Sequence, residues 1–139
     1  MKPTRNELSQ EFLRGRNCAQ CVLGRYAQSL GYDVEETDRM AACFGGGMFM
    51  GDACGAVTGA LMVIGLAAEQ GEAKEKALAF EEAFRAKCGS CRCRDLLGCD
   101  LSDPQQEQAA VASGKLIEYC PTPVLAAMDI LDELLEDVL

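Results

Sequence analysis

Apolar residues recur every three or four positions along most of this chain, which is the spacing of an amphipathic helix. In residues 72–87, for example, Ala77, Phe80 and Phe84 share one face, and Lys and Glu fill the opposite one. No stretch alternates apolar and polar residues as a half-buried strand would, and no hairpin dipeptide separates two such stretches. The pattern therefore predicts an all-α protein.

Three helix starts can be recognised near the N-terminus. Thr4 and Glu7 have the spacing of a capping box, in which each side chain satisfies a free amide at the start of a helix. Asn17 can cap a second helix that runs to Leu30, and Thr37 can cap a short third helix. These signals predict short helices joined by short turns.

The last helix is predicted to start at Thr122 and Pro123, because proline suits the first turn of a helix. Its apolar residues follow the four-three spacing of a seam between packed helices: Val124, Met128, Leu131, Leu135 and Val138. If this seam is exposed, it would also suit a homodimer.

The middle of the chain, residues 43–65, is rich in glycine. Gly45, Gly46 and Gly47 form a loop in which a backbone without side chains would let a substrate or a second thiol come near. No strand precedes this loop and no GK[ST] follows it, so the requirements of a P-loop or a dinucleotide fingerprint are not met.

An apolar helix over residues 53–68 is predicted to follow, with Asp52 as its N-cap. Gly51, Gly55 and Gly59 recur every fourth residue, so one face of this helix has almost no side chain. We therefore expect a neighbouring element to pack against that face at backbone distance.

Length and composition favour one compact globular domain. The chain has 139 residues, of which 49% are hydrophobic, enough to bury a real core. We therefore expect a single helical domain over residues 1–139, a bundle of about five to seven helices. It would carry the glycine-rich loop and a cysteine-rich loop at residues 88–103.

Charge and hydropathy limit the partners. The net charge of −9 disfavours nucleic acid and anionic lipid, both of which need a basic face. The first 16 residues lack an apolar signal region, and the apolar run 53–68 is too short for a confident membrane span. We expect a cytoplasmic protein that is not inserted in a membrane.

Nine cysteines and no histidine point to thiol chemistry. In a reducing cytoplasm a high cysteine content indicates metal ligation or redox work rather than a disulfide scaffold. Cys54 is predicted in the first turn of a helix, where the positive end of the helix dipole favours the thiolate. Cys93 lies in the densest cysteine cluster, between Arg92 and Arg94, whose positive charges would also stabilise a thiolate.

Two CxxC pairs support a metal-binding alternative. Cys18 with Cys21 and Cys88 with Cys91 could together form a Cys₄ site for zinc or an iron–sulfur cluster. The separation of the two pairs exceeds the roughly 15 to 20 residues that are usual between such pairs. In a third alternative, the cysteines are structural parts of a helical interaction protein.

Four segments resemble the family of redox-active proteins named for a C-GCAxxG-C-C pattern. The matching residues are Asn17-Cys18-Ala19-Gln20, Phe44-Gly-Gly-Gly-Met48 with Cys54-Gly-Ala-Val-Thr-Gly59, Cys93-Arg-Asp-Leu-Leu-Gly98, and Cys120. The resemblance covers nearly the whole chain and implies a compact helical protein with a redox role. Five further cysteines depart from the pattern: Cys21, Cys43, Cys88, Cys91 and Cys99.

The leading hypothesis is therefore a cytoplasmic redox protein, such as a thiol–disulfide oxidoreductase, that works by thiol–disulfide exchange or electron transfer. Cys54 and Cys93 would form the reactive centre, and Cys18 and Cys120 would be their partners. Exchange requires an attacking thiolate and a resolving thiol nearby, and it needs no cofactor. The expected partner is a redox protein or a small thiol or disulfide.

Overall fold

The computed structural model describes residues 2–139, apart from the side chain of Gln70, and this part of the chain forms nine α-helices and no strand. The all-α prediction is confirmed. The short helices α6 and α8, of five residues each, account for the excess over the five to seven expected. The helices are α1 (Arg5–Leu13), α2 (Cys18–Ala27), α3 (Val34–Met40), α4 (Gly55–Ala67), α5 (Ala73–Cys88), α6 (Cys93–Leu97), α7 (Pro104–Ala112), α8 (Lys115–Tyr119) and α9 (Pro121–Leu134).

The first two helices begin where their caps predict. Thr4 forms a capping box with Glu7, and Asn17 forms one with Gln20, in which its side chain accepts a hydrogen bond from the Gln20 amide at 2.8 Å. The predicted cap at Thr37 is wrong. Asp33 caps α3 instead, and Thr37 lies inside the helix, where its hydroxyl donates to a carbonyl three residues earlier.

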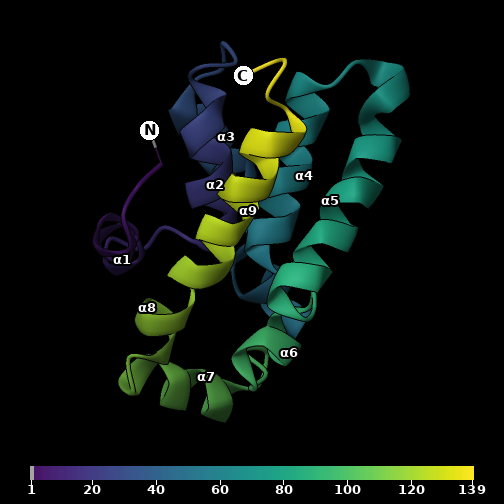
Figure 1. Ribbon diagram of the computed structural model, residues 1–139. Coiled ribbons are helices and arrows are strands. Elements are labelled where there is room, and N and C mark those ends of the chain that lie inside the picture. The colour runs from purple at the N-terminus through teal and green to yellow at the C-terminus, as the bar shows by residue number, and fades with distance from the viewer. Residues whose placement is uncertain (1) are drawn as a thin grey trace.

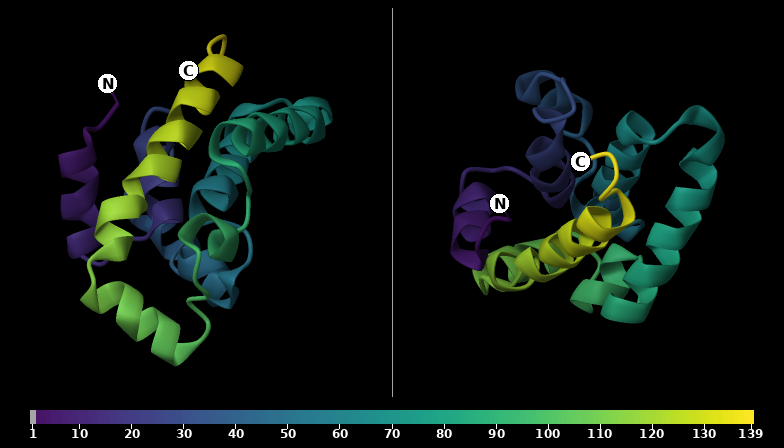
Figure 2. Two further views of the ribbon diagram at one scale, coloured as in Figure 1. Left: turned by 60° about the horizontal axis from the view of Figure 1, so that its bottom comes forward. Right: turned by 45° about the horizontal axis from the view of Figure 1, so that its top comes forward.

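Helices α2, α4 and α9 run side by side through the body of the protein, and α5 covers one side of α4 and α9 (Figures 1 and 2). Each of α2, α4 and α9 starts at the end of the bundle that is drawn lowest in Figure 1. The short helices α6, α7 and α8 cross beneath that same end. The N-terminal ends of the long helices α2, α4 and α9 therefore lie together, next to the three short helices.

The glycine face of α4 packs directly on the backbone of α2, as expected. A Cβ atom added at Gly59 would lie 2.8 Å from the carbonyl oxygen of Ala19, and one added at Gly55 would lie 2.9 Å from the Ala19 amide nitrogen. Real side chains essentially never approach so closely. These two glycines therefore set the distance between the helices that carry Cys18 and Cys54.

The seam of α9 is used inside the protein. Val124, Met128, Leu131 and Leu135 are completely buried, whereas Val138 is 45% exposed and does not continue the seam. The seam packs with Phe80 and Phe84 of α5 in one core, and these two rings stack at 5.8 Å between centroids. It therefore does not offer the exposed surface on which the homodimer expectation rested.

Tyr26 ties α2 to α9. Its hydroxyl lies 2.7 Å from a carboxylate oxygen of Asp132 and 3.1 Å from the carbonyl oxygen of Met128. We expect Tyr26→Phe to lower the free energy of unfolding by about 1–2 kcal/mol, because a hydrogen bond to a charged group is lost and Asp132 is partly exposed. Urea unfolding followed by circular dichroism measures this. Tyr32→Phe, at a ring that is 46% exposed, should change stability by less than about 0.5 kcal/mol; equal losses would contradict the assignment.

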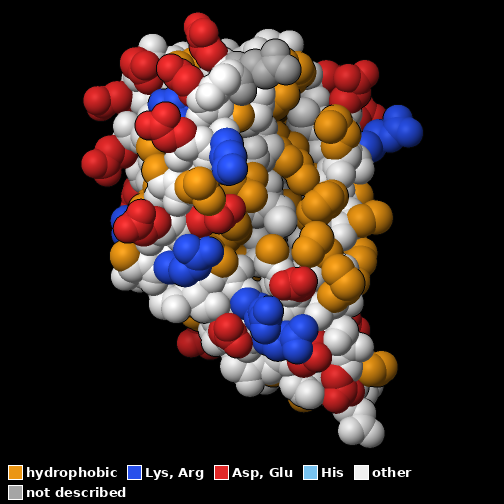
Figure 3. All heavy atoms as spheres, turned by 90° about the vertical axis from the view of Figure 1, so that its right-hand side faces the viewer, with side chains coloured by type: hydrophobic (Ala, Val, Ile, Leu, Met, Phe, Trp, Pro, Cys, Tyr) orange, Lys and Arg blue, Asp and Glu red, His pale blue; other side chains and the backbone are white. Residues whose placement is uncertain are grey.

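The side on which α5 lies carries basic and acidic side chains interspersed with apolar ones (Figure 3). The Lys and Arg side chains do not form one continuous basic patch on this face. Among residues 2–139, no helix combines the length and hydropathy that a membrane crossing requires, and the apolar helix α4 has only 13 residues.

Candidate functional site

Four cysteines stand at the N-terminal ends of four different helices. Cys18 and Cys93 are the first residues of α2 and α6, and Cys54 and Cys120 are the residues that immediately precede α4 and α9. Because all four helices start at the same end of the bundle, the four thiols come together there. These are the four cysteines singled out from the sequence as the redox centre.

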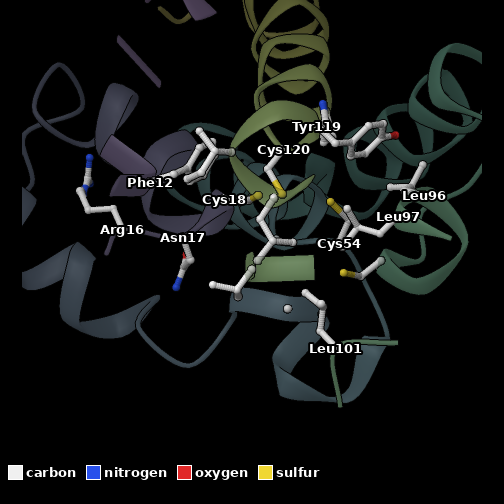
Figure 4. A pocket seen from close by; sticks show the side chains of 18 of the residues that line it. Phe12, Arg16, Asn17, Cys18, Cys54, Leu96, Leu97, Leu101, Tyr119 and Cys120 are labelled. Carbon is white, nitrogen blue, oxygen red and sulfur yellow. The ribbon is translucent and has the colours of Figure 1, made fainter. Parts of the chain in front are cut away.

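The four cysteines line one cavity of about 290 Å³. Figure 4 shows the sulfur atoms of Cys18 and Cys120 turned toward each other, with Cys54 beside them. Most of the remaining wall is apolar and comes from α1, α6, α8 and the loop before α7. The largest apolar side chains in it are Phe12, Leu96, Leu97, Leu101, Leu116 and Ile117.

A short antiparallel contact brings Cys54 and Cys93 to the same wall. Ala53 pairs with Arg92, the Cys54 amide donates to the Cys91 carbonyl at 2.8 Å, and the Cys93 amide donates to the Asp52 carbonyl at 2.6 Å. This pairing corrects the prediction that Asp52 is the N-cap of α4. The Asp52 carbonyl accepts from Cys93, Cys54 is the N-cap, and the helix starts at Gly55, three residues after Asp52.

The glycine-rich loop folds into a left-handed turn beside Cys93. Gly46, Gly47, Met48 and Phe49 all have φ between +57° and +64°, a conformation that costs about 1–2 kcal/mol for each non-glycine residue. A Cβ atom at Gly47 would lie 2.5 Å from the Asp52 amide nitrogen and 2.9 Å from Cys93 Cβ. The absence of a side chain at Gly47 thus leaves room for Cys93 beside the loop. Gly45 and Gly46 are close to Asn17 and Leu101 instead.

The two arginines that flank Cys93 have structural partners. Arg94 donates from Nε to the Gly51 carbonyl at 3.1 Å and from a terminal nitrogen to the Met50 carbonyl at 3.3 Å. Arg92 pairs with Asp52 at 3.8 Å and is half exposed. Neither side chain is part of the cavity wall. Arg94 therefore secures the strained turn, a role different from the thiolate stabilisation expected from the sequence.

Burial dominates the acidity of two of the four thiols. It raises the pKa of Cys54 to about 12, although the amides of Ala56 and Val57 at the start of α4 oppose the shift. It also raises the pKa of Cys93 to about 11, and Cys120, Cys99 and Asp100 add to that shift. The helix-start effect expected at Cys54 is present but is outweighed by desolvation.

Cys18 and Cys120 interact with each other, and their pKa values are shifted in opposite directions. The hydrogen bond between the two thiols raises the pKa of Cys18 well above its ordinary value, and burial adds to the shift. The same hydrogen bond lowers the pKa of Cys120, against the effect of its burial. Cys120 is therefore the one cysteine of the four whose pKa is lowered.

This difference should be visible in the pH dependence of alkylation. At pH 8, iodoacetamide should label Cys120 first among the four cavity cysteines of the native protein, because its pKa lies below the ordinary 9.0. Cys54 and Cys93 should be labelled only as the pH approaches their raised pKa values of about 12 and 11. Peptide mapping by mass spectrometry measures each rate, and protein unfolded in urea provides the reference. Labelling of Cys54 as fast as Cys120 at pH 8 would refute this order.

The other cysteines do not join the cavity. Cys21 is buried in the core, and its thiol pKa is raised to about 12 by that burial. Cys88 and Cys91 are half-buried, and the Cys91 thiol donates to the carbonyl oxygen of Glu81 at 3.8 Å. Cys43 is exposed, and Cys99 is half-buried.

The Cys₄ metal site proposed from Cys18, Cys21, Cys88 and Cys91 is not formed. In the part of the chain that the structure describes, no group of three or more cysteine and carboxylate side chains is arranged to hold a metal ion. The physical reason is that Cys18 faces the cavity while Cys21 lies one turn further along α2, inside the core. The two CxxC spacings are therefore not evidence of a shared site.

Sequence reasoning missed the apolar wall of the cavity. Leu96 and Leu97 follow Cys93 within α6, and Tyr119 and Pro123 flank Cys120, so proximity to the cysteines in sequence was a usable signal for them. Phe12 comes from α1 and gave no such signal. Nor did Met48 and Phe49 indicate a left-handed turn, since neither residue type favours positive φ.

The all-α fold brings four thiols together at converging helix starts, an arrangement suited to thiol chemistry. The particular family can be named: the model of the family described as "Putative redox-active protein (C_GCAxxG_C_C)" matches residues 16–134, and the chain belongs to this family. No curated protein and no solved structure matches the chain.

Proposed function

We propose that this protein is a thiol–disulfide oxidoreductase whose centre is the Cys18–Cys120 pair. The observation that carries the proposal is the convergence of four cysteines, from four separate parts of the chain, in one apolar cavity. Cysteines that serve only to fill a core need neither a cavity nor a hydrogen-bonded partner thiol. Free thiols in this number are typical of a reducing compartment, which supports a cytoplasmic location.

The exchange begins at Cys120. Its thiolate attacks one sulfur of a substrate disulfide, so a Cys120–substrate disulfide forms and the other substrate sulfur leaves as a thiolate. Cys18 then gives its proton to that leaving thiolate and attacks the Cys120 sulfur. This attack breaks the Cys120–substrate bond, and the second substrate sulfur leaves as a thiolate that takes up the proton that Cys120 had lost to water. The products are a Cys18–Cys120 disulfide and two substrate thiols, and two electrons have passed from the protein to the substrate.

Cys54 and Cys93 would act after this pair. Their raised pKa values make them slow attackers at neutral pH, which changes their proposed role from first nucleophile to second dithiol. Exchange within the cavity would reduce Cys18 and Cys120 and leave a disulfide between Cys54 and Cys93. An external dithiol partner would then restore the fully reduced protein.

A stoichiometric oxidation tests the proposal. Fully reduced protein is mixed, without oxygen, with one equivalent of hydroxyethyl disulfide. We expect two protein thiols to disappear, two equivalents of substrate thiol to be released, and the mass of the protein to fall by two hydrogens. Reduction by a dithiol should restore all nine thiols. A protein that stops at a stable mixed disulfide, or does not react, would refute the mechanism.

A further inference from the structure

We infer that the cavity selects a small, uncharged, apolar disulfide as its exchange substrate. The inference rests on the proposed function and adds a substrate class to it. Three properties of the cavity lead to this class: its size, the engagement of its polar groups, and the charge around it.

Size sets the first limit. A cavity of about 290 Å³ is roughly twice the volume of a cavity of about 150 Å³ that holds benzene, so it has room for about a dozen heavy atoms. A dialkyl disulfide or a single dithiolane ring with a short chain fits this space. A disulfide between two peptides does not.

The charged side chain and the side-chain amide of the wall already have partners. Among the described residues that line the cavity, Arg16 is the only charged one. It donates to Asp38 at 3.1 Å and to Glu11 at 3.3 Å, and its guanidinium is turned away from the cysteines in Figure 4. The amide of Asn17 donates to the carbonyl oxygen of Ala41 at 3.1 Å while its oxygen caps α2.

A charged substrate would therefore lose its hydration without gaining an unpaired side chain of opposite charge in the cavity. An anionic substrate would also be repelled by a protein whose net charge is −9. An apolar substrate gains from burial against the leucine side chains that surround the thiols. The reaction itself stays the balanced exchange described above, with the substrate disulfide reduced to two thiols and the Cys18–Cys120 pair oxidised.

Dipropyl disulfide and 3,3′-dithiodipropionate form a matched pair of probes, because the second is the first with a carboxylate on each chain. The rate at which each oxidises the reduced protein is divided by its rate with a free neutral thiol, N-acetylcysteine amide. The measurements are made in about 0.5 M salt, which screens the net charge of the protein. We expect the normalised rate of the apolar probe to be at least about tenfold higher.

Two lysine variants separate the cavity from the rest of the surface. Val111 lies in the cavity wall and is 61% exposed, so it marks the rim, whereas Leu78 is 55% exposed on α5 and is not part of the wall. Val111→Lys should reduce the preference for the apolar probe at least about threefold, because it places a cation at the entrance. Leu78→Lys adds the same charge and should leave the preference within about a factor of two.

The outcomes distinguish this inference from the proposed function. If both probes oxidise Cys18 and Cys120 with equal normalised rates, the substrate class is wrong and the exchange function stands. An equal effect of the two lysine variants would likewise overturn the role of the cavity. If neither probe oxidises the pair, the proposed function fails and the inference fails with it.

Discussion

Cys120→Ser should lower the rate at which a small disulfide oxidises the reduced protein at pH 7 by at least about tenfold. Among the other cavity thiols, Cys93 has a pKa raised to about 11, whereas the pKa of Cys120 lies below its ordinary 9.0. The lower pKa gives Cys120 the larger thiolate fraction, and the greater nucleophilicity of the more basic Cys93 thiolate offsets this advantage only in part. Stopped-flow mixing with hydroxyethyl disulfide measures the rate.

The matched control is Cys43→Ser, which removes an exposed thiol outside the cavity and should leave the rate of pair oxidation unchanged. Cys18→Ser gives a further check. In this variant Cys120 should still attack the substrate disulfide, but without Cys18 the reaction should stop at the disulfide between Cys120 and the substrate. A Cys120→Ser protein that is oxidised as fast as the wild type would assign the attack to another thiol.

Gly59→Ala should lower the free energy of unfolding by about 1–3 kcal/mol, although alanine is the better helix former. The added Cβ would lie 2.8 Å from the carbonyl oxygen and 3.0 Å from the Cα atom of Ala19. Both are backbone atoms of α2, so relief requires the whole helix to shift. Such a shift also moves Cys18 relative to Cys54, and we expect slower closure of the Cys18–Cys120 disulfide. Urea unfolding and the oxidation rate measure the two effects.

Gly65→Ala is the control in the same helix. Nothing lies within 4 Å of the Cβ position at Gly65, so only the gain in helix propensity remains. We expect this variant to be more stable than the wild type by up to about 1 kcal/mol. Because both variants change glycine to alanine within α4, the difference between them isolates the contact with α2. Equal changes in stability would show that this contact does not matter.

Local signals in the sequence were sufficient for much of the helical fold. Thr4 and Asn17 predicted helix starts correctly because a capping box depends on residues only three apart. Gly55 and Gly59 predicted close helix packing because a bare helix face leaves little else for a neighbour to contact. The helical spacing of Phe80 and Phe84 predicted that both face the core, and both are buried.

Errors arose where distant segments decide the local structure. Asp52 has the side chain of an N-cap, but its backbone pairs with Cys93, more than forty residues away along the printed sequence, and α4 starts later. Cys54 stands at a helix start, yet its pKa is governed by burial in the folded protein. Spacing within the chain likewise gave no sign that Cys21 is separated from Cys18 by the packing of α2.

The cysteines of the candidate site could be selected from the sequence, but their order of reactivity could not. The four cysteines were selected by resemblance, and the structure places all four around one cavity. Their order of reactivity depends on the contact between Cys18 and Cys120, which come from opposite ends of the chain. Only a three-dimensional arrangement could therefore assign the first attack to Cys120 instead of Cys54 or Cys93.

The most direct test of this account is to map the first disulfide that forms. Protein purified without oxygen is fully reduced, oxidised with one equivalent of a small disulfide, blocked with a thiol reagent and digested for mass spectrometry. The account predicts a peptide that links Cys18 to Cys120 as the main early product. If Cys18 and Cys120 instead remain free while Cys88 and Cys91 carry the disulfide, the cavity is not the redox centre.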